Sequence, residues 1–405
     1  MKYYKLQITW MVLFLMATTI FMPLAPTASA AANPLLAQTT AAGSSSGGGL
    51  LDIILGLLLG KLLGSSNDLS NGTKGNNPPA TGLGGKSAKD LVGFYAEWWD
   101  TDTSSFKAMS QHTDTINTIA PFWATLQSNG TVKDRGGNDH AAVVKFAKQN
   151  NIPTLLLVNN AKQEKSEIPI HTILANPALR TKSIDSMEAY IKQYGLDGIN
   201  VDFEMVPAQD RDNLSAFMKE LYNRLHPQGY VVSIDVFPKQ NEDNDVAAAY
   251  DYAALAQYAD KIMIMTYDNH GVWSGAGPIA DIGWVEKSLQ YALQYIPKNK
   301  LYLCVPGYGY DWSSKGVESI EYAPAMALAE KYNADIVWDD KAKAPHFDYT
   351  AADGTSHQVW FENSKSLSYK LDLVNKYDIA GAALWKLGEE DPGYWQVFKE
   401  HGFKK

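Results

Sequence analysis

Residues 196–204, with the sequence LDGINVDFE, constrain the fold of this chain more than any other stretch. Apolar and polar residues alternate along it, and this period of two predicts a β-strand whose two faces differ. One face carries Ile199, Val201 and Phe203, and the other carries Asn200, Asp202 and Glu204. Two carboxyl groups and an amide opposite a packed apolar face cost free energy unless their side is wet or does chemistry.

Amphipathic helix patterns on both sides of this strand indicate how it is used. The preceding pattern runs to Tyr194, and Gly195 follows where a helix would end. A second pattern covers residues 214–225, and a new apolar strand follows at 230–236. Such consecutive β/α units favour a parallel barrel, in which the C-terminal ends of the strands build the active site. The alternative is a half-exposed antiparallel strand with its polar side in water.

Eight apolar strand patterns recur along the chain, and helical patterns separate most of them. They cover residues 91–97, 115–122, 153–159, 196–204, 230–236, 261–267, 301–306 and 379–385. We therefore predict an α/β fold, a (β/α)8 TIM barrel over residues 90–405. The interval between strands 7 and 8 is too long for one helix. Its short alternating segments around Asp353-Gly354 predict a small α+β insertion at about residues 315–368.

The N-terminus is typical of an exported protein. Lys2 and Lys5 precede an apolar run over residues 8–24, and Ala28-Ser29-Ala30 is a small-residue cleavage site. We expect residues 1–30 to be a secretory signal peptide, which places the protein outside the cell or in the cell envelope. An uncleaved anchor is the alternative, because the run is nearly long enough to span a bilayer.

Residues 31–89 form a low-complexity linker rich in Gly, Ser and Asn. Within the linker, the apolar segment 50–63 is too short for a transmembrane helix. It could lie on a membrane or on the cell wall as a peripheral contact, or it could pack on the barrel or self-associate.

Charge and composition exclude several function classes. The net charge of −9 argues against a nucleic-acid partner. The single cysteine, Cys304, cannot form an intrachain disulfide and is expected to be a buried, inert thiol. Histidines such as His226, His346 and His357 lack the spacing of a metal site, so we expect neither a metal nor a cofactor.

The stretch 196–204 resembles the D-G-x-D-x-D-x-E signature at the fourth barrel strand of glycoside hydrolase family 18. The residues that carry the resemblance are Asp197, Gly198, Asn200, Asp202 and Glu204. The resemblance extends from about residue 91 to the C-terminus, and it is closest to a bacterial branch related to spore-cortex-lytic N-acetylglucosaminidases. Asn200 departs from the aspartate that most chitinases have. It can hydrogen-bond Asp202 but cannot take up its proton, which could change the pH optimum.

Chemistry and the resemblance together assign roles at the site. Glu204 is the natural general acid, because it is last on the strand and nearest the barrel mouth. The resemblance implies that the 2-acetamido group of a β-linked N-acetylhexosamine acts as the nucleophile, held by Asp202 and Tyr267. The resemblance also implies that the Trp385 ring forms the bottom of the subsite for the sugar that is cleaved, and that Asp268 binds the sugar. We expect the substrate-binding residues to be Asn200, Asp268, Trp385, Trp98 and Glu362, and the partner to be a polysaccharide that contains N-acetylglucosamine.

Three functions fit these expectations. The first is an exported N-acetylglucosaminidase that cleaves peptidoglycan in the spore cortex or the cell wall. The second is a chitinase or chitooligosaccharide hydrolase with the same chemistry. The third is an inactive carbohydrate-binding or coat protein on the same fold, which the presence of both Asp202 and Glu204 disfavours.

Overall fold

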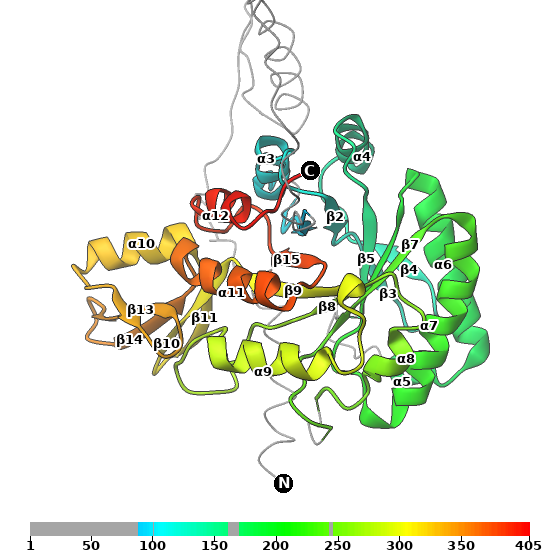
Figure 1. The fold of residues 1–405 in the computed structure, drawn as a ribbon. Coiled ribbons are helices and arrows are strands. Elements are labelled where there is room, and N and C mark those ends of the chain that lie inside the picture. The colour runs from blue at the N-terminus through cyan, green and yellow to red at the C-terminus, as the bar shows by residue number, and fades with distance from the viewer. Residues whose placement is uncertain (1–87, 100, 161–169, 243–245) are drawn as a thin grey trace, which may run out of the picture.

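A closed barrel of parallel strands forms the centre of the computed structural model, which describes residues 88–99, 101–160, 170–242 and 246–405 (Figure 1). Its strands are β1 (Asp90–Tyr95), β2 (Thr118–Pro121), β5 (Leu155–Asn159), β6 (Gly198–Asp202), β7 (Val231–Val236), β8 (Lys261–Ile264), β9 (Leu301–Pro306) and β15 (Gly381–Trp385). Neighbours pair in parallel from β5 through β9 to β15, β1 and β2. The Ile119 amide closes the ring by donating to the Pro153 carbonyl at 3.0 Å. The predicted TIM barrel is confirmed.

Helices surround the barrel, and their ends follow the sequence signals. The helices around the barrel are α3 (Ser104–Gln111), α4 (His140–Gln149), α5 (Ile170–Leu174), α6 (Pro177–Tyr194), α7 (Arg211–Leu225), α8 (Tyr252–Leu255), α9 (Ile282–Ala292), α11 (Ser364–Tyr377) and α12 (Tyr394–Glu400). Short 3-10 turns lie at η2 (Ala208–Asp210), η3 (His226–Gln228) and η4 (Lys298–Lys300). Helix α6 ends before Gly195, whose φ of 62° is a left-handed conformation that glycine adopts without strain.

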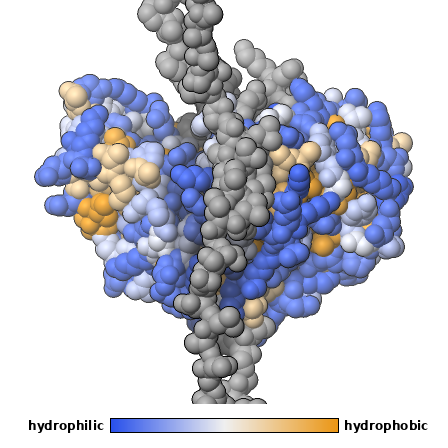
Figure 2. All heavy atoms as spheres, turned by 90° about the horizontal axis from the view of Figure 1, so that it is seen from above, coloured by the Kyte–Doolittle hydropathy of each residue, from blue (hydrophilic) through white to orange (hydrophobic). Residues whose placement is uncertain are grey.

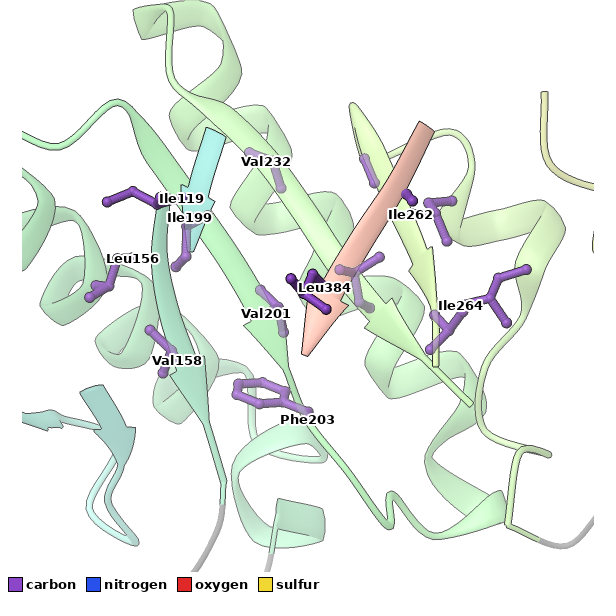
Figure 3. Close-up of a cluster of buried hydrophobic side chains, with 14 of the residues drawn as sticks. Ile119, Leu156, Val158, Ile199, Val201, Phe203, Val232, Ile262, Ile264 and Leu384 are labelled. Atoms are coloured by element: carbon purple, nitrogen blue, oxygen red, sulfur yellow. The ribbon is translucent and has the colours of Figure 1, made fainter. Parts of the chain in front are cut away.

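The alternation of side chains predicted for residues 196–204 directs them into two different regions, the layer between strands and helices and the barrel interior. Ile199, Val201 and Phe203 point away from the barrel axis and pack with the helices and with neighbouring strand residues (Figure 3). The barrel interior holds a second apolar cluster that includes Phe94, Met263 and the fully buried Cys304. Asn200 and Asp202 point into this interior, because their side chains alternate with the outward-facing set. The antiparallel, half-exposed alternative for this strand is wrong, since β6 is parallel to both neighbours and buried throughout.

Two antiparallel additions lie beside the barrel. A hairpin of β3 (Ala124–Leu126) and β4 (Val132–Asp134) extends the sheet next to β5 and was not predicted. The insertion after β9 contains β10 (Tyr308–Ser313), β11 (Gly316–Glu321), α10 (Tyr322–Lys331), β12 (Val337–Asp339), β13 (Ala344–Thr350) and β14 (Ser356–Phe361). Its five-stranded sheet has the order β11-β10-β14-β13-β12 and projects from one side of the barrel (Figure 1).

The insertion is displaced toward the N-terminus from the range expected, 315–368. It begins at Tyr308, because β10 follows β9 after a single residue, and its last strand ends at Phe361. The segment from Ser364 belongs to barrel helix α11, where Asn363 and Ser366 form a capping box. The predicted turn at Asp353-Gly354 joins β13 to β14, with Gly354 at φ 85°.

Hydrophilic residues dominate the face shown in Figure 2, and hydrophobic residues form small separate areas on it. Large hydrophobic side chains that are exposed among the described residues are Trp99, Tyr295, Ile336 and Val337. None of the helices in the described ranges is long and apolar enough to cross a bilayer. The predicted signal peptide, the linker and its apolar segment 50–63 lie outside the described residues.

Candidate active site

The end of β6 places two carboxyl groups at the C-terminal mouth of the barrel. Asp202 is 6% exposed, and Glu204, just beyond the strand, is half-buried. The side chain of Asn160 fixes the Glu204 backbone on both sides: its Nδ2 donates to the Glu204 carbonyl at 2.8 Å, and its Oδ1 accepts from the Glu204 amide at 2.8 Å. The Tyr250 hydroxyl donates to the Phe203 carbonyl at 2.7 Å. These contacts set the direction in which Glu204 leaves the strand.

A third carboxyl group, Asp235 on β7, lies beside this pair and was missed in the sequence. Strands β6 and β7 pair with Asn200 opposite Ser233, so Asp235 occupies the position on β7 that corresponds to Asp202 on β6. Asn200 Nδ2 donates to Asp235 Oδ2 at 2.5 Å, and the Ser233 hydroxyl donates to Asn200 Oδ1 at 2.6 Å. The Asn200 amide is therefore bound to Asp235 and Ser233 rather than to Asp202.

One oxygen of Asp235 has no hydrogen-bond partner among the described residues, although it is buried. The whole side chain is 2% exposed. A buried, unpartnered carboxylate oxygen is costly, and a proton shared within the carboxyl cluster reduces that cost. The alternation of Ser233 and Asp235 with apolar residues in the predicted strand 230–236 was the signal that could have found this group.

Asp202, Glu204 and Asp235 interact electrostatically, so the protonation of each depends on the charge of the others. Burial, and then the neighbouring Asp235, raises the pKa of Asp202 well above its ordinary value. Burial also raises the pKa of Glu204, with further contributions from Asp202 and Asp268. The pKa of Asp235 is raised by burial and by Glu204, and the hydrogen bond from Asn200 opposes the shift. Each carboxylate opposes the ionisation of its neighbours, so the cluster keeps a proton to a higher pH than an isolated carboxyl group would.

Tyr267 and Asp268 reach the cluster from the end of the β8 segment. Burial, followed by Cys304 and Asp235, raises the pKa of the Tyr267 hydroxyl, which therefore stays protonated and can donate. Asp268 Oδ1 accepts from the hydroxyls of Tyr308, at 2.5 Å, and Tyr310, at 3.0 Å. Burial raises the pKa of Asp268 to about 6, although these two hydrogen bonds lower it. Both tyrosines belong to β10, so the insertion contributes to the site, and neither was predicted.

Aromatic rings line the barrel side of the site. Trp385, at the end of β15, lies 5.4 Å from the Phe94 ring and 6.0 Å from the Phe122 ring, measured between ring centroids. Trp98 lies edge-on to Phe122 at 6.2 Å, and its indole N–H donates to Glu389 at 3.2 Å. Trp385 packs against the interior cluster and against the insertion, as Tyr267 does. Both tryptophans thus lie among the aromatic rings that end or follow barrel strands β15 and β1, and their contact with a sugar stays a prediction.

Glu362 does not join the site, and the prediction that it contacts substrate is wrong. Its side chain is 1% exposed, and its carboxylate forms an ion pair with Lys370 at 2.7 Å. The same oxygen accepts a hydrogen bond from Ser366 at 2.5 Å. Glu362 thus lies buried between the last strand of the insertion, which ends at Phe361, and the start of helix α11. The sequence pattern could not separate this buried pair from a cleft residue, because Lys370 lies eight positions further along.

A model of glycosyl hydrolases family 18 matches residues 90–390, which include every site residue described above. This chain belongs to glycosyl hydrolase family 18. It is a glycosidase on a TIM barrel, as the sequence predicted. Among the described residues, no group of three or more His, Cys, Asp or Glu side chains is arranged to hold a metal ion.

The relatives of this family 18 chain include enzymes of bacterial spores and chitinases. It is 33% identical over 294 residues to the cortical fragment-lytic enzyme of Bacillus anthracis, covering 70% of this chain and 67% of that enzyme. The spore cortex-lytic enzyme SleL of Bacillus cereus superposes with a TM-score of 0.72 at 29% identity, covering 78% of this chain and 75% of that one. A chitinase from Chromobacterium violaceum superposes with a TM-score of 0.71 at 28% identity, covering 78% of this chain and 100% of that one.

The coupling within the acid cluster predicts how the pH dependence of activity changes when Asp235 alone is neutralised. We expect Asp235→Asn to retain activity but to move the alkaline limb of the kcat/KM profile to lower pH by about one unit. Activity is lost as pH rises through the pKa of the catalytic acid, and removing a nearby negative charge lowers that pKa. The pH–rate profile measures the shift. Asp185→Asn, an exposed aspartate on α6 that pairs with Arg224, is the matched control. An unshifted limb would show that Asp235 is not coupled to the acid.

Proposed function

We propose that this protein is an exported N-acetylglucosaminidase that cleaves β-linked N-acetylglucosamine in peptidoglycan, of the spore cortex or the cell wall, by substrate-assisted, retaining catalysis. The observation that carries the proposal is a pair of carboxyl groups at the barrel mouth, Asp202 at the end of β6 and Glu204 just beyond it, both with raised pKa values. Membership of the family supports glycoside cleavage, and the similarity to the cortical fragment-lytic enzymes supports a cortex or wall substrate.

In this proposal Glu204 first acts as the general acid. Its raised pKa favours the protonated carboxyl group, which can donate its proton to the oxygen of the leaving sugar. As the glycosidic bond breaks, the carbonyl oxygen of the substrate's 2-acetamido group bonds to the anomeric carbon and forms an oxazolinium ion. Glu204, now ionised, takes a proton from the water that opens this ring, which restores the acid and retains the anomeric configuration.

Asp202 and Tyr267 hold the acetamido group during these steps. Asp202 lies two residues before Glu204, roughly 7 Å back along the strand. It is therefore too deep to attack the anomeric carbon, but it can accept the acetamido N–H and stabilise the positive charge of the oxazolinium ion. The Tyr267 hydroxyl, which keeps its proton, donates to the acetyl oxygen. Asp235 lies behind Asp202 and raises its pKa, and Asn200 holds Asp235 in place by donating a hydrogen bond to its Oδ2.

The sugar itself binds between the aromatic rings and Asp268. A sugar face stacks on an aromatic ring, and Trp385 is the floor of the site in this proposal. Asp268 uses Oδ1 for the two tyrosines of the insertion, which leaves Oδ2 for a sugar hydroxyl. The second candidate function is a chitinase or chitooligosaccharide hydrolase, which the similarity to the Chromobacterium violaceum chitinase favours.

A parallel digest tests the proposal against this alternative. Purified spore cortex, vegetative cell wall and chitin are treated with the protein, and the soluble products are identified by mass spectrometry. We expect muropeptides with a reducing-end N-acetylglucosamine from at least one of the two bacterial glycans, and little release from chitin. Chitooligosaccharides as the main product would support the chitinase instead. The absence of any product, with the protein folded, would favour an inactive binding or coat protein.

A further inference from the structure

At the barrel mouth lies an arginine that has no carboxylate partner among the described residues. Of the four arginines in the chain, Arg180, Arg211 and Arg224 each pair with acidic side chains. Arg135, immediately after β4, forms no ion pair with any described residue. It is half-buried, and burial lowers its pKa to about 10, which still leaves it charged at neutral pH. A partly desolvated cation is costly unless an anion binds it.

The fold holds the Arg135 guanidinium firmly. Its central carbon lies 4.0 Å from the centroid of the Phe122 ring, a cation–π contact. Nη1 donates to the Thr125 hydroxyl at 3.3 Å, and the Arg135 backbone amide donates to the Trp123 carbonyl at 2.8 Å. A guanidinium has five N–H groups, and only one of them, on Nη1, is donated to a described residue. The remaining groups form a planar fork that suits a carboxylate.

The same contacts place Arg135 beside the catalytic cluster. Phe122, over which it lies, contacts both Trp98 and Trp385, the rings that line the site. Thr125, its hydrogen-bond partner, donates in turn to Asn159 Oδ1 at 2.9 Å. Asn159 ends β5 directly opposite Asp202 on β6. Arg135 therefore lies at the same end of the barrel as Glu204, on the β5 side of the site.

We propose that Arg135 forms an anion-binding subsite that takes a carboxylate of muramic acid in the glycan. Chains of N-acetylglucosamine alone are neutral. Muramic acid carries a lactyl ether on O3, whose carboxyl group is free or is extended by a peptide that ends in carboxylates of its own. The inference rests on the proposed peptidoglycan substrate. It adds a reason for the choice of substrate: the Arg135 guanidinium, which has no acidic partner among the described residues, gains one when a muramyl residue occupies the neighbouring position.

The test compares one glycan in charged and neutral forms. Peptide-free glycan strands carry free lactyl carboxylates, and coupling them to methylamine converts these to neutral amides without changing the sugar chain. We expect wild type to prefer the carboxylate form, and we expect Arg135→Gln to reduce this preference, the ratio of the two kcat/KM values, by about ten- to a hundredfold. Arg135→Lys keeps the charge but not the fork and is expected to lie between the two. Arg224→Gln, on the outer surface of α7, is the matched control.

A third arm locates the carboxylate. If the anion belongs to the peptide, strands that keep their stem peptides show the arginine effect and peptide-free strands do not. An equal loss on the charged and amidated glycans would assign Arg135 a purely structural role over Phe122 and overturn the inference. The proposed function fails in a different way: wild type would then leave every muramyl glycan intact, whatever residue stands at position 135.

Discussion

Glu204→Gln is expected to lower kcat by roughly 10²–10⁴-fold or more, while the protein stays folded and still binds glycan. Gln has nearly the same shape as Glu but cannot deliver a titratable proton to the leaving oxygen. The backbone contacts that place the residue, from Asn160 to the Glu204 amide and carbonyl, do not involve the side chain and should persist. Turnover of a soluble glycan, together with thermal unfolding and glycan binding, measures the three expectations.

The matched control for this variant is Glu330→Gln, on the exposed surface of α10 in the insertion. It makes the same chemical change away from the barrel mouth and should leave turnover within twofold or so of wild type. Near wild-type turnover by a correctly folded Glu204→Gln protein would refute the assignment of Glu204 as the acid. The next acids to examine would then be Asp235 and Asp268, which share its cluster.

Most of the barrel could be predicted because its signals are local. A strand buried on both sides is a short apolar run, and a barrel helix shows its apolar face at a fixed spacing. The stop at Gly195 is likewise readable within a few residues. The capping box at Asn363 was not predicted, so the first turn of α11 was assigned to the insertion. The β3–β4 hairpin and the start of the insertion were missed for the opposite reason. Strand β10 follows β9 after one residue, whereas the insertion was expected to begin only at about residue 315, beyond the end of β10.

The site was predicted where one strand carries it and missed where several elements meet. Asn200 and Asp202 lie on β6 and Glu204 follows just beyond its end, so the alternation within one short stretch was enough to predict them together. Asp235, Tyr308, Tyr310 and Asn160 come from other elements, and only the register of β6 with β7, or the fold of the insertion, brings them together. Glu362 was misassigned because it forms a buried ion pair with Lys370 of helix α11. No local sequence pattern reveals this pair.

Asp202→Ala is expected to reduce kcat by about 10²–10³-fold and to weaken binding of a thiazoline mimic of the oxazolinium ion. Asp202 is the deep carboxyl group that can accept the N–H of the reacting acetamide, and the truncated side chain offers no acceptor. Losing a hydrogen bond to a charged group corresponds to about tenfold or more in the Ki of the mimic. The Ki for the mimic, compared with the KM for substrate in the same variant, separates lost charge stabilisation from lost sugar binding.

Asp202→Asn sharpens this test because it keeps the size of the side chain. Asn offers an oxygen to the acetamide but no negative charge, so the mimic should bind more weakly than to wild type, whereas the KM should change little.

Two further measurements, both on the wild-type protein, test the same step of the mechanism. Wild type should release product with retained configuration in proton NMR, and de-N-acetylated glycan should not be cleaved, because it lacks the internal nucleophile. Inverted product, or equal cleavage of the deacetylated glycan, would require a carboxylate of the protein as nucleophile or base. Asp268 would then be the strongest candidate, since it contributes to the raised pKa of Glu204 and has one oxygen free of the tyrosine hydroxyls.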